Sequence, residues 1–160
     1  MASASRPVGR PGRIAILTFS GGSGIVSADF IEEQGLSLAE LSPATKDALV
    51  RLFPDWMPVS NPVDLWPSIE KHGGGNIDVY SMALSAVLAD PNVDAVFLHT
   101  YAGNFRIGLN IADLAEQTRT AGKPAFALWN ELECHLVDSG VCKENPGRGH
   151  GDCEREIPDL

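Results

Sequence analysis

Residues 13–24 of this 160-residue chain read RIAILTFSGGSG, an apolar run that is followed at once by a glycine-rich turn. The apolar part, Arg13 to Thr18, does not alternate with polar residues, which is typical of a strand covered on both faces in a parallel sheet. From Ser23 to Gln34 apolar side chains recur at helical spacing, so we expect them to face the sheet. They are Ile25, Val26, Phe30 and Ile31. Gly35 predicts the end of this helix.

The rest of the chain repeats this alternation of strand and helix. Ser42 and Pro43 are a typical helix start, with serine as the N-cap and proline in the first turn. Residues 53–67 contain four prolines and predict a long irregular connection. Further strands are expected at 36–41, 95–99 and 125–129, and further helices at 44–52, 77–89 and 109–121. This order predicts an α/β fold, a parallel sheet with helices on both faces, in which ligands bind at the carboxyl ends of the strands.

Composition narrows the possible functions. A chain of 160 residues, 44% of them hydrophobic, can form one domain without disulfides or a structural metal. The net charge of -9 argues against nucleic acid or an anionic membrane surface as a partner. No apolar run has the length of a membrane-spanning helix, and residues 1–12 have the composition of a disordered arm or interdomain linker. We therefore expect a cytoplasmic protein.

The C-terminal end differs in composition from the rest. Residues 143–160 are almost entirely polar and predict a solvated tail, which leaves 13–142 as the folded domain. This end also carries cysteines and histidines, and both are common zinc ligands. They are Cys134, His135, Cys142, His150 and Cys153. Because no two of them form a C-x-x-C pair, we expect no metal site and interpret the cysteines as free thiols, with an oxidised pair as the alternative.

The glycine turn SGGSG, at 20–24, is the strongest candidate for a binding site. Backbone N–H groups in the first turn of a helix have no helical partner and lie at the positive end of the helix dipole, so they can bind an anion. A tight turn that needs small residues for geometry alone is the alternative. The turn is no Walker A loop, because no Gly-Lys-Ser/Thr follows. It matches half of the dinucleotide fingerprint through Gly22 and Gly24, with Ser27 at the third glycine position and Glu40 near the ribose position, so an NAD-binding half-domain stays open.

Three stretches occur in an order that is more specific than any of them alone. They are GRIAILTFSGGSGIVSADFIEEQGLSLAEL at 12–41, SNPVDL at 60–65 and ADPNVDAVFLH at 89–99. Together they resemble the NDP-forming acyl-CoA synthetases, the superfamily of succinyl-CoA synthetase and ADP-forming acetate-CoA ligase. The resemblance covers about 12–132 and is to the second flavodoxin-like domain, the CoA-ligase domain. It implies a three-layer flavodoxin-like, or Rossmann-like, fold.

The resemblance also implies roles for particular residues. Enzymes of this family convert an acid, CoA and an NTP into acyl-CoA, an NDP and phosphate, through an acyl phosphate and a phosphohistidine held between two helix N-termini. One of those N-termini would be formed here by Ser20, Gly21, Gly22, Ser23, Gly24 and Ile25. The loop after the strand at 95–99 would border the acyl substrate through Ala102, Gly103 and Asn104. Asn61 and Asp64 of SNPVDL are further candidates, either as ligand contacts or as Asx turns that close the chain.

Several parts of such an enzyme are missing from this sequence. The Ser-His-Thr-Gly motif of the phosphohistidine does not occur, and we interpret His99 as a partly buried histidine, so we place no catalytic residue in this chain. The resemblance implies partner domains with the phosphohistidine, CoA-binding and ATP-grasp functions, and a homo-oligomer is possible. CoA, ATP or ADP with Mg²⁺, and phosphate would be substrates, with no tightly bound cofactor. We expect the isolated chain to be inactive. A non-catalytic module that binds nucleotide or CoA is the main alternative.

Overall fold

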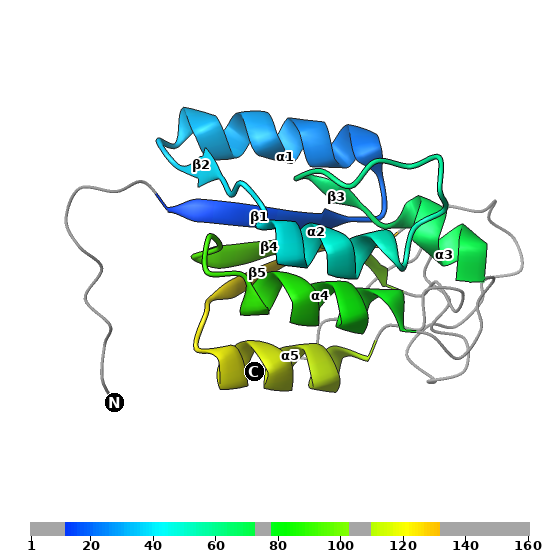
Figure 1. Ribbon diagram of the computed structural model, residues 1–160. Helices are drawn as coiled ribbons and strands as arrows, with labels where there is room; N and C mark the ends of the chain where they lie inside the picture. The colour runs from blue at the N-terminus through cyan, green and yellow to red at the C-terminus, as the bar shows by residue number, and fades with distance from the viewer. Residues whose placement is uncertain (1–11, 73–77, 103–109, 132–160) are drawn as a thin grey trace, which may run out of the picture.

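The computed structural model describes residues 12–72, 78–102 and 110–131 (Figure 1). The polar tail and all but the last residue of the predicted arm lie outside these ranges. The strands are β1 (Arg13–Thr18), β2 (Ser37–Leu38), β3 (Val63–Asp64), β4 (Ala95–Ala102) and β5 (Ala125–Glu131). The helices are α1 (Gly21–Glu33), α2 (Pro43–Val50), α3 (Trp66–His72), α4 (Val79–Ala89) and α5 (Ile111–Ala121).

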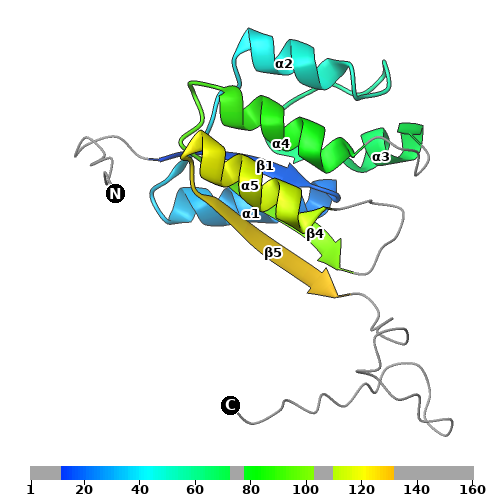
Figure 2. The same cartoon turned by 90° about the horizontal axis from the view of Figure 1, so that it is seen from below.

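All strand pairs are parallel, and the sheet order is β2-β1-β4-β5. Strand β3 pairs with the end of β1, whereas β2 pairs with its beginning. Helix α1 covers one face of the sheet, and α2, α4 and α5 lie on the other face (Figures 1 and 2). The predicted α/β class, with a parallel sheet between two helical layers, is confirmed.

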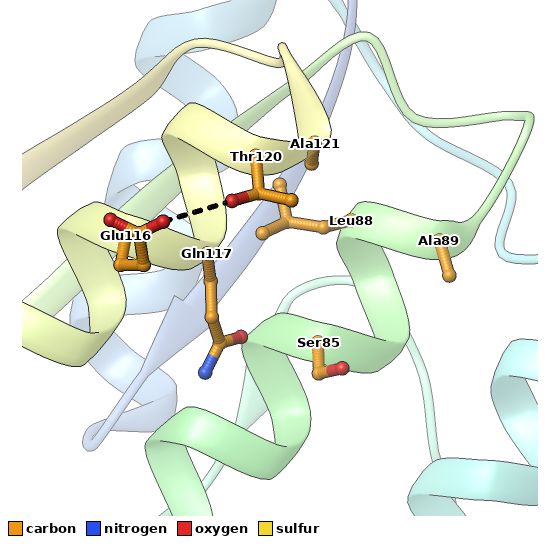
Figure 3. Close-up of a pocket in the computed structure, with 7 residues that line it drawn as sticks. All are labelled: Ser85, Leu88, Ala89, Glu116, Gln117, Thr120 and Ala121. Carbon is orange, nitrogen blue, oxygen red and sulfur yellow. Dashed lines mark hydrogen bonds between the residues drawn. The ribbon is translucent and has the colours of Figure 1, made fainter.

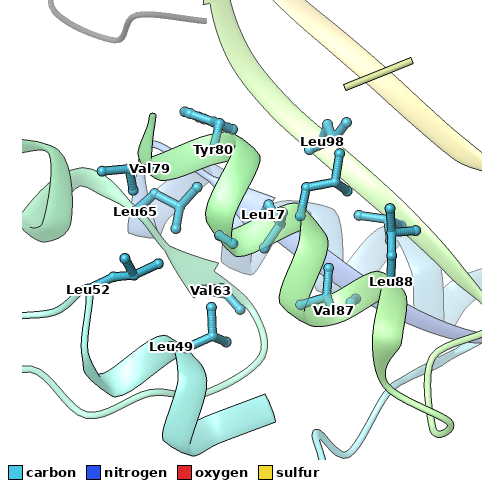
Figure 4. Close-up of a cluster of buried hydrophobic side chains, with 14 of the residues drawn as sticks. Leu17, Leu49, Leu52, Val63, Leu65, Val79, Tyr80, Val87, Leu88 and Leu98 are labelled. Carbon is cyan, nitrogen blue, oxygen red and sulfur yellow. The ribbon is translucent and has the colours of Figure 1, made fainter. Parts of the chain in front are cut away.

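The core explains why the first strand does not alternate with polar residues. Leu17 of β1 and Leu98 of β4 lie on the side of α4 and belong to the larger hydrophobic cluster (Figure 4). Ile14 and Ile16 of β1 point the other way and pack with Ile31 of α1. Because successive side chains of a strand point to opposite faces and both faces are covered, every position of β1 after Arg13 is buried.

Helix α1 buries a different face from the one that its apolar residues predict. It packs through Gly24, Ala28 and Ile31, one stripe at spacings of four and three residues. Gly24 lies so close to the sheet that a Cβ there would make a tight contact with Thr18, at 3.0 Å. This contact sets the rotation of the helix and turns three of the four predicted residues outward. Their exposed fractions are 62% for Ile25, 70% for Val26 and 62% for Phe30.

This rotation predicts an unusual order of mutational effects on α1. Ile31→Val removes one methylene from a side chain that is 8% exposed, and we expect it to lower the free energy of unfolding by about 1 kcal/mol. Phe30→Ala removes a whole ring from an exposed position and should change that free energy by less than about 0.5 kcal/mol. Urea unfolding of both variants tests the order. A larger loss for Phe30→Ala would contradict the observed packing.

The prediction of an irregular connection over 53–67 was wrong for the last residues of that segment, which form regular structure. It contains β3, and α3 begins within it at Trp66. Proline is compatible with the first turn of a helix, because N–H groups there need no helical partner, and Pro67 is the second residue of α3. Strand β2 is shorter than predicted. Strand β4 is longer, because Thr100 to Ala102 pair with the end of β5 and are not part of a loop.

Candidate functional site

The carboxyl end of β1 brings together residues that are far apart in the sequence. Thr18, the last residue of β1, is paired with Asp64 of β3 on one side and with His99 of β4 on the other. Helix α1 begins three residues after Thr18. The glycine turn, the SNPVDL stretch and the third strand therefore meet at one edge of the sheet, where parallel α/β sheets bind ligands.

The first turn of α1 begins at Gly21, two residues earlier than predicted, and Ser20 is its N-cap. The Ser20 side chain accepts a hydrogen bond from the Ser23 N–H at 3.5 Å, and the Ser20 carbonyl accepts the first helical bond from Gly24 N–H at 2.9 Å. The N–H groups of Gly21 and Gly22 have no hydrogen-bond acceptor among the residues that the structure describes. Two backbone donors are thus available at the positive end of the helix dipole.

Thr18, which is fully buried, forms hydrogen bonds with the turn before α1. Its hydroxyl donates to the Ser20 carbonyl oxygen at 2.9 Å and accepts from the Ser20 N–H at 3.1 Å. This double contact ties the N-cap residue to the end of β1. The direction of the Gly21 and Gly22 N–H groups is therefore fixed by the sheet rather than by the loop alone.

The glycines of the turn have different surroundings. A Cβ at Gly24 would lie 3.0 Å from Thr18 Cγ2 and 3.0 Å from Pro62 Cβ, so a side chain there would press on both neighbours. A Cβ at Gly22 would have only the Ser20 hydroxyl oxygen nearby, at 4.0 Å. Gly22 is exposed, and its backbone is accessible from solvent. The need for a small residue in a tight turn therefore explains the glycine at 24 and does not explain the glycine at 22.

Asp64 lies beside the start of α1. One of its carboxylate oxygens, Oδ1, accepts a hydrogen bond from the Trp66 N–H at 3.1 Å. The other, Oδ2, lies 3.0 Å from the position that a Cβ on Gly21 would take. A side chain at Gly21 would therefore press on this carboxylate. Of the two SNPVDL candidates, Asp64 is the one that the fold places at the glycine turn.

Asn61 lies away from the carboxyl edge, between the strands. Its side-chain amide donates to the carbonyl oxygens of Ile14 at 2.8 Å and Ala39 at 3.0 Å, and its Oδ1 accepts from the Ile16 N–H at 2.9 Å. Both amide hydrogens are used in these bonds. Asn61 fills the gap between the part of β1 that pairs with β2 and the part that pairs with β3, as a structural clamp would.

His99 is 4% exposed, so it is buried more completely than the partly buried histidine that the sequence predicts. Its Nδ1 lies 3.5 Å from the Thr18 hydroxyl oxygen, and its ring lies against Phe19 with the centroids 5.2 Å apart. The Tyr80 hydroxyl donates to the His99 carbonyl oxygen at 2.8 Å. Burial lowers the pKa of His99, which favours the neutral form of its imidazole. The sequence alone does not connect His99 with the glycine turn, because only the strand register makes His99 a neighbour of Thr18.

Charged groups at the opposite edge of the sheet have structural partners. Arg13 forms an ion pair with Asp94 at 3.0 Å. Asp90 is buried and accepts from the backbone N–H groups of Ser42 at 2.7 Å and Asn92 at 2.8 Å. Burial by itself raises the pKa of Asp90, but these hydrogen bonds outweigh it and hold that pKa below its usual range. These charges join the ends of elements to one another.

A shallow groove runs between α4 and α5, and its lining residues are shown in Figure 3. They are Ser85, Leu88, Ala89, Glu116, Gln117, Thr120 and Ala121. These residues belong to the last turns of two helices that lead into the amino ends of β4 and β5. The groove is therefore at the edge of the sheet opposite to the glycine turn and is not part of the candidate site.

Some predicted residues cannot be placed. Ala102 is the last residue of β4 and pairs with Glu131, while Gly103 and Asn104 lie outside the described residues. The cysteines and histidines of the C-terminal end also lie outside them. Within the described ranges, no three His, Cys, Asp or Glu side chains are grouped to hold a metal ion, and no helix has the length and apolar character needed to cross a membrane.

The fold and the site define a doubly wound α/β domain with two available backbone donors at the carboxyl edge of its sheet. A family model described as the Ligase-CoA domain matches residues 14–124. The chain belongs to the Ligase-CoA domain family. The resemblance to ADP-forming acyl-CoA synthetases that the sequence predicts is thereby confirmed.

Relatives with curated descriptions agree with this family. The chain is 31% identical over 121 residues to ADP-forming acetate–CoA ligase II of Archaeoglobus fulgidus, a match that covers 76% of this chain and 18% of that protein. It is 34% identical over 131 residues to the alpha subunit of ADP-forming acetate–CoA ligase II of Pyrococcus furiosus, covering 78% and 27%. The chain thus spans only about a fifth to a quarter of the length of these relatives.

Solved structures show the same fold. The crystal structure of PH0766 from Pyrococcus horikoshii superposes with a TM-score of 0.61 at 25% identity, over 81% of this chain and 29% of that one. A dinucleotide-forming acetyl-coenzyme A synthetase 1 of Ca. Korarchaeum cryptofilum, in complex with phosphate and ADP, superposes with a TM-score of 0.56 at 21% identity, over 81% and 27%. The second likeness is evidence for the fold alone.

Proposed function

We propose that this chain is the CoA-ligase domain of a larger ADP-forming acyl-CoA ligase and that α1 binds the transferred phosphoryl group. The complete enzyme converts an acid, CoA and ATP into acyl-CoA, ADP and phosphate, with Mg²⁺ bound to the nucleotide. Its phosphohistidine, CoA-binding and ATP-grasp functions come from partner domains or subunits. Family membership and the short span of the chain relative to its relatives support this proposal.

One observation carries the phosphoryl role of α1. The Gly21 and Gly22 N–H groups have no acceptor among the described residues, and they lie at a helix N-terminus on the edge of the sheet where ligands bind. A phosphoryl group carries about two negative charges and offers several acceptor oxygens. Donors that are already oriented by the sheet need no rearrangement when this charge arrives. The site binds an anion without a basic side chain, which fits a chain with a net charge of -9.

The contribution of one backbone donor is tested by a matched pair of substitutions at Gly22. Gly22→Pro removes the N–H at a position in the first helical turn, where proline is compatible with the helix. Gly22→Ala keeps the N–H and adds a methyl group in open space. In the ligase assembled with its partner domains, Gly22→Pro should lower the rate of acyl-CoA formation by about tenfold to a hundredfold, the range for a hydrogen bond to a charged group.

Gly22→Ala is the control and should keep the rate within about twofold of the wild type. Phosphorylation of the partner histidine by ATP and its dephosphorylation by acid and CoA should be followed separately with both variants. Equal rates for Gly22→Pro and the wild type would exclude the Gly22 N–H from the reaction. Tight binding of nucleotide or CoA by the isolated chain would instead favour a regulatory binding module.

A further inference from the structure

His99 has a position that the proposed phosphoryl role does not by itself explain. It is 4% exposed, and it lies beside Thr18 in the register of β4 against β1. Its Nδ1 faces the Thr18 hydroxyl oxygen at 3.5 Å, and its ring contacts Phe19, the residue between Thr18 and the N-cap. The Tyr80 hydroxyl holds the backbone of His99 through its carbonyl oxygen. The imidazole is therefore fixed directly behind the turn that leads into α1.

The hydrogen bonds of the Thr18 hydroxyl bear on which tautomer His99 adopts. A hydroxyl has one hydrogen to donate and two lone pairs to accept with. The Ser20 carbonyl oxygen, 2.9 Å away, can only accept, so it takes the hydroxyl hydrogen. The Ser20 N–H, 3.1 Å away, takes one lone pair. The remaining lone pair is left for His99 Nδ1, which can bond to it only by carrying a hydrogen. This geometry favours the Nδ1–H form of His99.

We propose that His99 is a positioning residue for the first turn of α1. As the Nδ1–H tautomer it donates to the Thr18 hydroxyl oxygen, which orients that hydroxyl toward the Ser20 carbonyl and so fixes the direction of the Gly21 and Gly22 N–H groups. His99 does not touch the phosphoryl group. The functional meaning of this inference rests on the proposed phosphoryl role of the turn. The tautomer of His99 and its effect on the conformation of the turn can be measured without any ligand.

The surroundings of His99 support a neutral ring in this role. Burial lowers its pKa, because a charged imidazole would lose hydration inside the sheet. A neutral ring with one hydrogen has a defined donor and a defined acceptor, so it can select one orientation of Thr18.

Three substitutions at His99 separate positioning from packing in the full 160-residue chain. Asparagine places an amide N–H near the position of Nδ1 and should keep the donor. Glutamine places its amide near the position of Nε2 and should lose it. Leucine fills the buried space without any donor. A long-range ¹H–¹⁵N spectrum of the wild-type imidazole reports the tautomer, and ¹H–¹⁵N signals of residues 20–24 report the geometry of the turn.

We expect the wild-type spectrum to show hydrogen on Nδ1 and none on Nε2. The signals of residues 20–24 should stay at their wild-type positions in His99→Asn and shift in His99→Gln and His99→Leu. In a titration with inorganic phosphate, the dissociation constant should rise about two- to tenfold for His99→Gln and His99→Leu, the range for one hydrogen bond, and stay near the wild-type value for His99→Asn. Because leucine suits a buried site at least as well as asparagine, rescue by asparagine is not an effect of global stability.

Two results would overturn the inference: hydrogen on Nε2 rather than Nδ1, or turn signals that are the same in His99→Asn and His99→Leu. A different result would count against the proposed function alone. If phosphate shifts no signal of residues 20–25 in the wild-type chain or in the assembled ligase, α1 is not a phosphoryl site. The ligand-free spectra of the three variants would still decide whether His99 holds the turn.

Discussion

Asn61→Leu is expected to lower the free energy of unfolding by about 3 kcal/mol or more, because three backbone groups lose their hydrogen-bond partner at once. The Asn61 amide bonds the Ile14 and Ala39 carbonyls and the Ile16 N–H. Leucine has a similar volume and no polar atom. Each orphaned polar group of this kind costs about 1–3 kcal/mol, and whole domains of this size are stable by only about 5–15 kcal/mol.

Urea unfolding followed by circular dichroism measures this loss, and the neighbouring Ser60 supplies the control. Ser60 is exposed, and its hydroxyl makes one long contact, to the Pro62 carbonyl oxygen at 3.5 Å. Ser60→Ala should change the free energy of unfolding by less than about 0.5 kcal/mol. A loss of under about 1 kcal/mol in Asn61→Leu would contradict the structural role of these three hydrogen bonds.

Gly24→Val is expected to lower the free energy of unfolding by about 2–3 kcal/mol, the upper range for overpacking of a buried contact. The first added carbon would lie 3.0 Å from both Thr18 Cγ2 and Pro62 Cβ. Thr18 Cγ2 is at the end of the buried strand β1, and the ring of Pro62 is rigid. Because neither neighbour can give way easily, α1 itself would have to move away from the sheet. In an open helix the same position would gain stability from any residue other than glycine or proline.

Gly22→Ala is the matched control in the same helical turn. Its added methyl group meets open space, so the free energy of unfolding should stay the same or rise slightly. Gly24→Ala should fall between the two, because the first carbon alone already makes both close contacts. If Gly24→Val and Gly22→Ala were equally stable in thermal and urea unfolding, the close approach of α1 to the Pro62 loop would be wrong.

The two glycine positions show how far the sequence pattern reached. SGGSG after an apolar strand predicts a helix N-terminus at a sheet edge, and that is where α1 begins. The pattern does not say which glycine is needed for packing and which leaves its backbone open. That difference depends on Thr18, which approaches Gly24 from the sheet, and on Pro62, which approaches it from a distant loop.

The apolar residues of α1 show the opposite limit. Helical periodicity identified the helix, but it selected the wrong face. A hydrophobic pattern assumes that the largest apolar side chains are buried, whereas α1 is buried along Gly24, Ala28 and Ile31. The contact of Gly24 with the sheet sets the rotation of the helix and leaves Phe30 exposed. The presence of a helix could thus be predicted from the repeating pattern of its apolar residues. Its orientation could not, because a single close contact in space decides it.

By itself the sequence determined the α/β class, the glycine turn at a helix start, and the family, because these depend on local periodicity, capping residues and the order of motifs along the chain. Only the tertiary structure decided the partners of that turn. It placed Thr18, Asp64 and His99 side by side and put Asn61 between the strands, because register and strand order bring together residues up to 81 positions apart. Hydrogen bonds act over about 3 Å in space, and no sequence spacing specifies them.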